Sequence, residues 1–75
     1  MNLIWEVSSH GTAWDLFVED VKGARILMAF VNVLDDRSYH IEWWDSLTSN
    51  ERNGTTFVGT EAEMQAYVVA LVRMA

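Results

Sequence analysis

The residues best suited to chemistry lie together in the stretch HIEWWD. His40 and Glu42 stand two positions apart, so on a strand they share a face and have the minimum geometry of an acid-base pair or half a metal site. A zinc or non-haem iron site needs a third ligand, and His10, Asp15 and Glu6 lie in other segments without a supporting motif. We therefore expect no metal and no other cofactor, and a histidine paired with a carboxylate.

Nucleophilic catalysis has the right residue types but the wrong arrangement. Ser38, His40 and Asp45 all belong to one segment, and neither a G-x-S-x-G elbow nor a glycine-rich oxyanion turn accompanies them. The 4 glycines are scattered singly, so no loop is expected to cradle a phosphate. The sequence indicates binding rather than catalysis.

The composition predicts one small folded domain, residues 1–75. Of the 75 residues, 51% are hydrophobic, with 4 Trp, 3 Phe and 2 Tyr available for a core. A chain of this size buries only about 60% of the surface that it exposes when unfolded, so burial by a partner could add to its stability. The absence of cysteine excludes disulfides, thiolate metal sites and cysteine nucleophiles.

The charge restricts the class of partner. Eleven acidic against five basic residues give a net charge of −6, which repels nucleic-acid phosphates and anionic lipids and attracts basic protein surfaces. The start, MNLIWEVSSHGT, has no basic segment, and the longest apolar run, residues 26–31, is far shorter than a membrane span. We therefore expect a cytoplasmic protein that binds neither nucleic acid nor membrane directly.

Alternation of apolar and polar residues predicts strands at residues 3–8, 12–20 and 38–45. Residues 24–34 also fit a helical stripe, but the turn signals on both sides and the valines near the end favour a central strand.

The C-terminal part predicts a loop followed by a helix. Residues 46–54 are polar, and Asn53-Gly54-Thr55 is interpreted as a turn; residues 55–58 are either a short fifth strand or an extended lead-in. Thr60 and Glu63 form a capping box, which predicts an amphipathic helix to about Met74. The expected fold is α+β: an antiparallel meander of four strands, or five, with one C-terminal helix packed on one face.

Such a sheet would have one covered and one open face. The helix stripe covers the face with these residues: Leu3, Trp5, Val7, Trp14, Leu16, Val18, Ile26, Met28, Phe30, Tyr39, Ile41 and Trp43. The opposite face carries an apolar group from three strands: Phe17, Leu27, Ala29, Val31, Val33 and Trp44. Trp43 is thus expected in the core and Trp44 on a surface that no second helix covers.

Acidic residues surround this open face and occupy the turns beside it. The acidic residues are Glu6, Asp15, Glu19, Asp20, Asp35, Asp36, Glu42 and Asp45. His40 lies on the same face. An apolar patch with a polar rim is typical of an interaction site. Two partners fit: a foreign protein with a basic groove, or a second copy of the chain in a sheet-on-sheet or edge-to-edge homodimer that buries Leu27, Val31 and Trp44.

Two resemblances add to this interpretation. The ending FVGTEAEMQAYVVAL, after a run of strands, is similar to the strand-then-helix close of the arm-type DNA-binding domains of phage integrases, although Glu42 and Asp45 disfavour entry into a DNA groove. In size, acidity and layout the chain resembles small phage-encoded inhibitors of host defence, the anti-CRISPR and DNA-mimic proteins. This second resemblance implies a protein that occupies a basic channel or subunit surface, with the carboxylates in place of phosphates.

Overall fold

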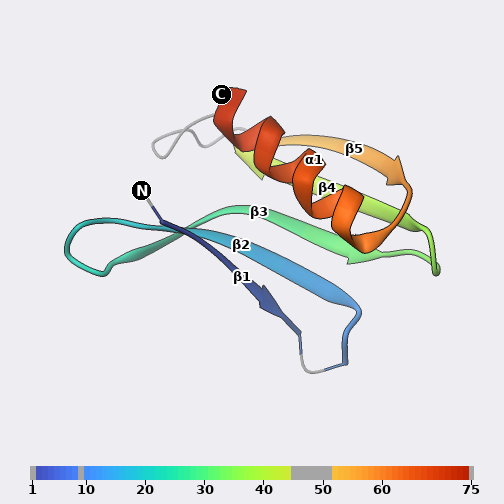
Figure 1. Ribbon diagram of the computed structural model, residues 1–75, viewed down its shortest axis with the longest axis horizontal. Coiled ribbons are helices and arrows are strands. Elements are labelled where there is room, and N and C mark those ends of the chain that lie inside the picture. Colours follow the sequence, from blue (N-terminus) through green and yellow to red (C-terminus); the bar gives the residue numbers. More distant parts are fainter. Residues whose placement is uncertain (1, 9, 45–51, 75) are drawn as a thin grey trace.

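A computed structural model describes residues 2–8, 10–44 and 52–74 of the chain. Its elements are β1 (Asn2–Val7), β2 (Ala13–Glu19), β3 (Arg25–Val33), β4 (Ser38–Trp44), β5 (Arg52–Val58) and α1 (Glu61–Met74). The strands form an antiparallel sheet in the order β1-β2-β3-β4-β5, and α1 packs on one side of it (Figure 1). The predicted α+β fold is confirmed, with five strands in the meander, and residues 25–33 form a strand rather than a helix.

The first two hairpins turn at glycines that adopt positive φ. Gly11 has a φ of 67° and Gly23 a φ of 83°, a region that side chains with a Cβ rarely adopt. In the second hairpin a carboxylate oxygen of Asp20 accepts hydrogen bonds from the backbone N–H groups of Lys22 and Ala24, at 2.8 and 3.0 Å. These local bonds fix where β2 ends and β3 begins.

The capping box forms as the sequence predicts. The hydroxyl oxygen of Thr60 accepts a hydrogen bond from the backbone N–H of Glu63 at 3.1 Å, and the Glu63 carboxylate accepts one from the backbone N–H of Thr60 at 2.9 Å. Each side chain thus accepts a hydrogen bond from a backbone N–H group at the start of α1. Such N–H groups have no carbonyl partner within the helix itself.

The core lies between α1 and the central strands. Its buried side chains are Leu16, Val18, Met28, Ala29, Val31, Tyr39, Ile41, Met64, Val68 and Val72. The helix packs chiefly on β3 and β4, so β1 and β2 extend beyond it (Figure 1). The helix also contacts β5, where the Tyr67 ring stacks on Phe57 with ring centroids 4.9 Å apart.

A β-bulge in β3 changes which of its residues face the helix. Leu16 of β2 pairs with Ala29, but the next residue, Phe17, pairs with Leu27, so Met28 has no partner in β2. Met28 and Ala29 are both buried in the core, one directly after the other. The extra residue reverses the alternation along the rest of β3.

The bulge makes part of the predicted facing wrong. Ala29, Val31 and Val33 lie on the helix side, in line with Trp43, Ile41 and Tyr39 of β4. Phe30, which was expected in the core, lies on the opposite side in line with Glu42. Val31 is 0% exposed within its own core, so it cannot contribute to a homodimer contact on the opposite side of the sheet.

The turn predicted at Asn53-Gly54-Thr55 is also wrong, because these residues belong to β5. Gly54 pairs with Glu42, and Thr55 with Ile41. Pairing with β4 holds a polar, glycine-containing segment in a strand that its own sequence does not favour. The part of the predicted loop at residues 46–51 lies outside the described residues.

Two carboxylates make the stability of this fold depend on pH. Hydrogen bonds from the backbone N–H of Arg37 and from Ser38 lower the pKa of Asp35, and those from the backbone N–H and hydroxyl of Thr60 lower the pKa of Glu63. A carboxyl group whose pKa is lower in the folded than in the unfolded state adds stability at every pH above its unfolded pKa. This added stability is lost as the pH falls through the folded pKa.

We therefore expect the urea midpoint to fall between pH 5 and pH 2. In Asp35→Asn and Glu63→Gln, the titrating group is absent while an oxygen acceptor remains, so the fall should be smaller than in the unmodified chain. An equal fall in all three proteins would contradict this account of the two hydrogen bonds.

Candidate docking face

The side of the sheet opposite α1, called here the second face, carries a group of large apolar side chains. Strand alternation and the bulge bring together the second-face cluster, which consists of Ile4, Phe17, Leu27, Phe30 and Trp44. All five side chains are half-buried, and none of them packs against the core beneath the helix. They form a separate apolar group that no second layer covers within the part of the chain that the structure describes.

The register shows how the cluster crosses the sheet. Ile4 of β1, Phe17 of β2 and Leu27 of β3 stand side by side in one row. On the β4 side, the rings of Phe30 and Trp44 lie with centroids 6.1 Å apart and planes at 53°. An aromatic pair of this kind adds about 0.5–1.5 kcal/mol beyond the area that it buries, which helps to hold both rings in place on an open surface.

Carboxylates flank the cluster in the next row of residues. Glu6, Asp15 and Glu42 stand in line with Phe30 across β1, β2, β3 and β4. Phe30 therefore lies between Asp15 and Glu42, which places an aromatic ring inside an acidic row.

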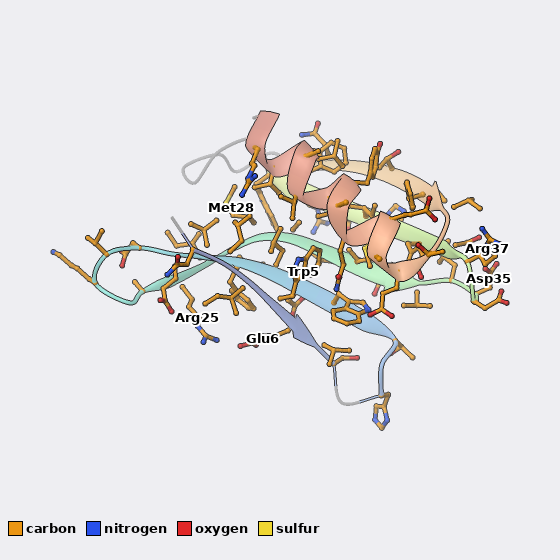
Figure 2. The ribbon with its side chains drawn as sticks, in the orientation of Figure 1. Trp5, Glu6, Arg25, Met28, Asp35 and Arg37 are labelled. Atoms are coloured by element: carbon orange, nitrogen blue, oxygen red, sulfur yellow. The ribbon has the colours of Figure 1, made fainter. Side chains whose placement is uncertain are left out.

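Two arginines of the chain bind to these acids. Arg25 of β3 forms ion pairs with Glu6 of β1 and with Glu19 of β2, the latter at 3.7 Å. Figure 2 shows Arg25 and Glu6 on the side of the sheet away from the helix, whereas Trp5 and Met28 lie on the helix side. These pairs are partly exposed, so each contributes no more than about 1 kcal/mol to stability.

The second arginine combines an ion pair with an aromatic contact. Arg52 of β5 lies 3.5 Å from a Glu42 oxygen, and its guanidinium carbon is 6.0 Å from the centre of the Phe30 ring. The chain itself therefore shows that this face holds a guanidinium group between a carboxylate and a ring.

Asp15 differs from the other acids of its row. It is half-buried between Glu6 and Phe30, and the described residues supply it with neither an ion pair nor a hydrogen bond. A cation from outside the chain could pair with this carboxylate without first displacing an arginine.

Most of the predicted docking residues do meet on the second face. Phe17, Leu27 and Trp44 belong to the cluster, and the polar residues that the register places beside them are Glu6, Asp15, Glu19, His40 and Glu42. Val31 and Val33 were predicted to lie here but face the helix, because the bulge at Met28 reverses the alternation of the residues that follow it in β3. Trp43 and Trp44 point to opposite sides, as predicted.

The acids at the turns have local structural roles. Asp20 caps the second hairpin, and a carboxylate oxygen of Asp35 accepts a hydrogen bond from the backbone N–H of Arg37 at 2.9 Å. Asp36 is exposed in the same turn, and Asp45 lies outside the described residues. The turn acids thus stand at the ends of the sheet and not within the cluster.

The catalytic and metal interpretations gain no geometric support. His40 and Glu42 share the second face, but no hydrogen bond joins them, and the partner of Glu42 is Arg52. Among the described residues, no group of three or more histidines and acids is placed to hold a metal ion.

Sequence reasoning missed four residues of this face: Ile4, Phe30, Arg25 and Arg52. Alternation in residues 3–8 already sets Ile4 on the side of Glu6, so that signal was present. Phe30 could not be placed, because an unbroken apolar run gives no sign of a bulge. The two arginines depend on pairings between strands, which a single sequence does not show.

No family model, curated protein or solved structure matches the chain. Within the described ranges, no helix combines the length and apolar character needed to cross a membrane. The assignment of the second face as a candidate docking site therefore depends on its geometry.

Proposed function

We propose that this protein is a non-enzymatic binding module that docks its second face on a basic surface of a protein partner. The observation that carries the proposal is the second-face cluster itself, a group of large apolar side chains outside the core and bordered by carboxylates. A patch with an apolar centre and a polar rim matches the anatomy of protein interfaces.

The cluster supplies anchors of the kind that dominate binding energy. Aromatic side chains at the centre of an interface carry much of its affinity, and Phe30 and Trp44 are already in contact with each other. Because strands hold both residues, little conformational entropy is lost when a partner covers them. The partner surface should therefore present apolar side chains opposite these two rings.

Charge determines the second requirement of the partner. The acidic row favours arginine or lysine opposite it, and Asp15 is the carboxylate without a partner among the described residues. The contact of Arg52 with Glu42 and Phe30 indicates that an incoming arginine could bind in the same manner. A surface that alternates basic and apolar residues fits both features.

A partner that handles nucleic acid is the specific form of this function that we propose. Grooves that bind nucleic acid carry clustered arginine and lysine, and a chain with net charge −6 is attracted to them. An inhibitor that covers such a groove is the role implied by the resemblance to anti-CRISPR and DNA-mimic proteins. On this chain Glu6, Glu19 and Glu42 are paired with arginines, so apolar contacts must supply much of the affinity.

The test uses defined peptides rather than an unknown partner. Ten-residue peptides that alternate arginine with leucine are titrated into the protein, with glutamate-leucine peptides as the charge control. We expect binding of the arginine peptide that weakens as salt rises.

The Phe30→Ser variant keeps the net charge and removes one ring, and it should lower peptide affinity about tenfold, the equivalent of about 1.4 kcal/mol. The matched control is Tyr67→Ser, which removes an exposed ring on the helix side and should leave the affinity unchanged. Equal affinity in all three proteins would show that only net charge attracts the peptide, and would contradict docking on the second face.

A further inference from the structure

We propose that the free edge of β1 is a second interaction site, and that its partner is β1 of a second copy of the chain. β1 stands at the end of the strand order and pairs only with β2 in the part of the chain that the structure describes. This inference does not rest on the proposed docking function, because it concerns the edge of the sheet and not its second face.

The backbone of β1 presents alternate hydrogen-bonding groups at this edge. The backbone N–H of Ser8 donates to the carbonyl oxygen of Ala13 at 2.8 Å, which continues the antiparallel register of β1 with β2. Residues that bond toward β2 alternate along an antiparallel strand with those that point away. Leu3, Trp5 and Val7 therefore direct their backbone N–H and C=O groups outward.

The sequence of this edge carries little of the usual protection against pairing. Natural edge strands often carry charged residues, especially lysine, or proline or a bulge; β1, with the sequence NLIWEV, has one charged residue, Glu6, which is paired with Arg25, and it has no lysine, proline or bulge. β5, at the other edge of the sheet, is more polar and contains Arg52 and Gly54. The edge of β1 is the better template for a further strand.

A second copy fits this edge in one register better than in the others. In a two-fold pairing of β1 with β1, each side chain stays on its own side of the sheet only if odd-numbered residues lie opposite odd-numbered ones and even opposite even. When Leu3 faces Trp5 of the second copy, Ile4 faces its own equivalent and Glu6 faces Asn2. A shift by two residues would instead set the Glu6 carboxylate against Ile4.

Charge does not oppose this register strongly. The two Glu6 side chains are offset by four residues along the paired strands, a distance of about 13 Å. This exceeds the Debye length of about 8 Å at physiological ionic strength. Each Glu6 is also paired with Arg25 of its own chain.

Pairing at this edge would extend both sides of the sheet. On the helix side it places the half-buried Trp5, whose ring meets that of Trp14 edge to face at 6.2 Å, against Leu3 of the second copy. On the second face it joins Ile4 to its equivalent, so two second-face clusters become one continuous surface. The edge contact leaves both second faces open to a partner.

The experiment combines a mass measurement with a cysteine cross-link. Light scattering from about 10 μM to about 1 mM protein, a range that covers weak dimers, should show the mass rise from one chain to two. Because the Leu3 N–H points outward, Leu3→Pro removes no bond to β2 but blocks the edge, so it should keep the strand signal in circular dichroism and stay monomeric. Leu3→Ala, which keeps the N–H, should still dimerise.

The chain has no cysteine, so single cysteines report on distance. Ile4→Cys should form a disulfide-linked dimer under mild oxidation, because residues directly opposite have Cβ atoms about 5 Å apart. Phe17→Cys, on the same face but one strand inward, should not. A monomer at all concentrations, a dimer that persists in Leu3→Pro, or equal cross-linking of both cysteine variants would each overturn the proposal.

Discussion

Val31→Lys is expected to remove most of the folding free energy, whereas Phe30→Lys, which places lysine one residue earlier, is expected to leave the fold intact. Val31 is 0% exposed between the sheet and α1, so lysine there would bury an ammonium group that has no acidic partner. The cost of such a charge is about 4 kcal/mol or more. A chain of this length has a total stability of about 4–11 kcal/mol, so most of the folding free energy would be lost.

Phe30→Lys places its ammonium group on the second face between Asp15 and Glu42, where both neighbours attract it. It loses the ring contact with Trp44, which is about 0.5–1.5 kcal/mol beyond the buried area, and the contact of Arg52 with the ring. Thermal unfolding monitored by circular dichroism separates the two variants. A folded Val31→Lys together with an unfolded Phe30→Lys would mean that β3 lacks the bulge at Met28.

The second large effect concerns the adjacent tryptophans. Trp43→Ser is expected to destabilise the domain by about 3 kcal/mol, because Trp43 packs against the core on the helix side. Trp44→Ser should cost clearly less than this, because Trp44 does not pack against the core and its ring contact is with Phe30 on the open face. Urea unfolding of the two variants provides the comparison.

For peptide affinity, Trp44→Ser should have the larger effect and Trp43→Ser the smaller one. Trp44→Ser should lose affinity for the arginine-leucine peptide, whereas any Trp43→Ser protein that remains folded should keep it. If both variants unfold at the same urea concentration, the two tryptophans do not belong to separate faces.

The elements of this fold could be predicted from the sequence because each has a local signal. Alternation marks β1, β2 and β4 to within a residue or two, and the capping box of Thr60 and Glu63 marks the start of α1. Both signals arise from contacts between residues that are close in the chain.

The errors occurred where distant contacts decide the structure. In β3 the run of apolar residues is compatible with either face, and only pairing with β2 reveals that Met28 is an extra residue. In β5 the turn-like Asn53-Gly54 is held in a strand by β4. Sequence alone identified Trp44 and the acids of the second face, but the central position of Phe30 follows from the bulge.

These corrections change the character of the candidate site. With Val31 and Val33 on the helix side, the second face is less aliphatic and more aromatic than the sequence suggested. The arginine pairs also neutralise part of its acidic border. The face thus resembles a mixed apolar and charged protein interface more than a row of phosphate substitutes.

The most direct test of the docking face is methyl NMR during titration with the arginine-leucine peptide. Ile4 and Leu27 belong to the second-face cluster, whereas Ile41 and Val68 are buried between the sheet and the helix. The account predicts that the methyl signals of Ile4 and Leu27 shift in proportion to bound peptide while those of Ile41 and Val68 remain in place. Shifts confined to residues of the helix side, or saturable binding with no shift at Ile4 and Leu27, would contradict it.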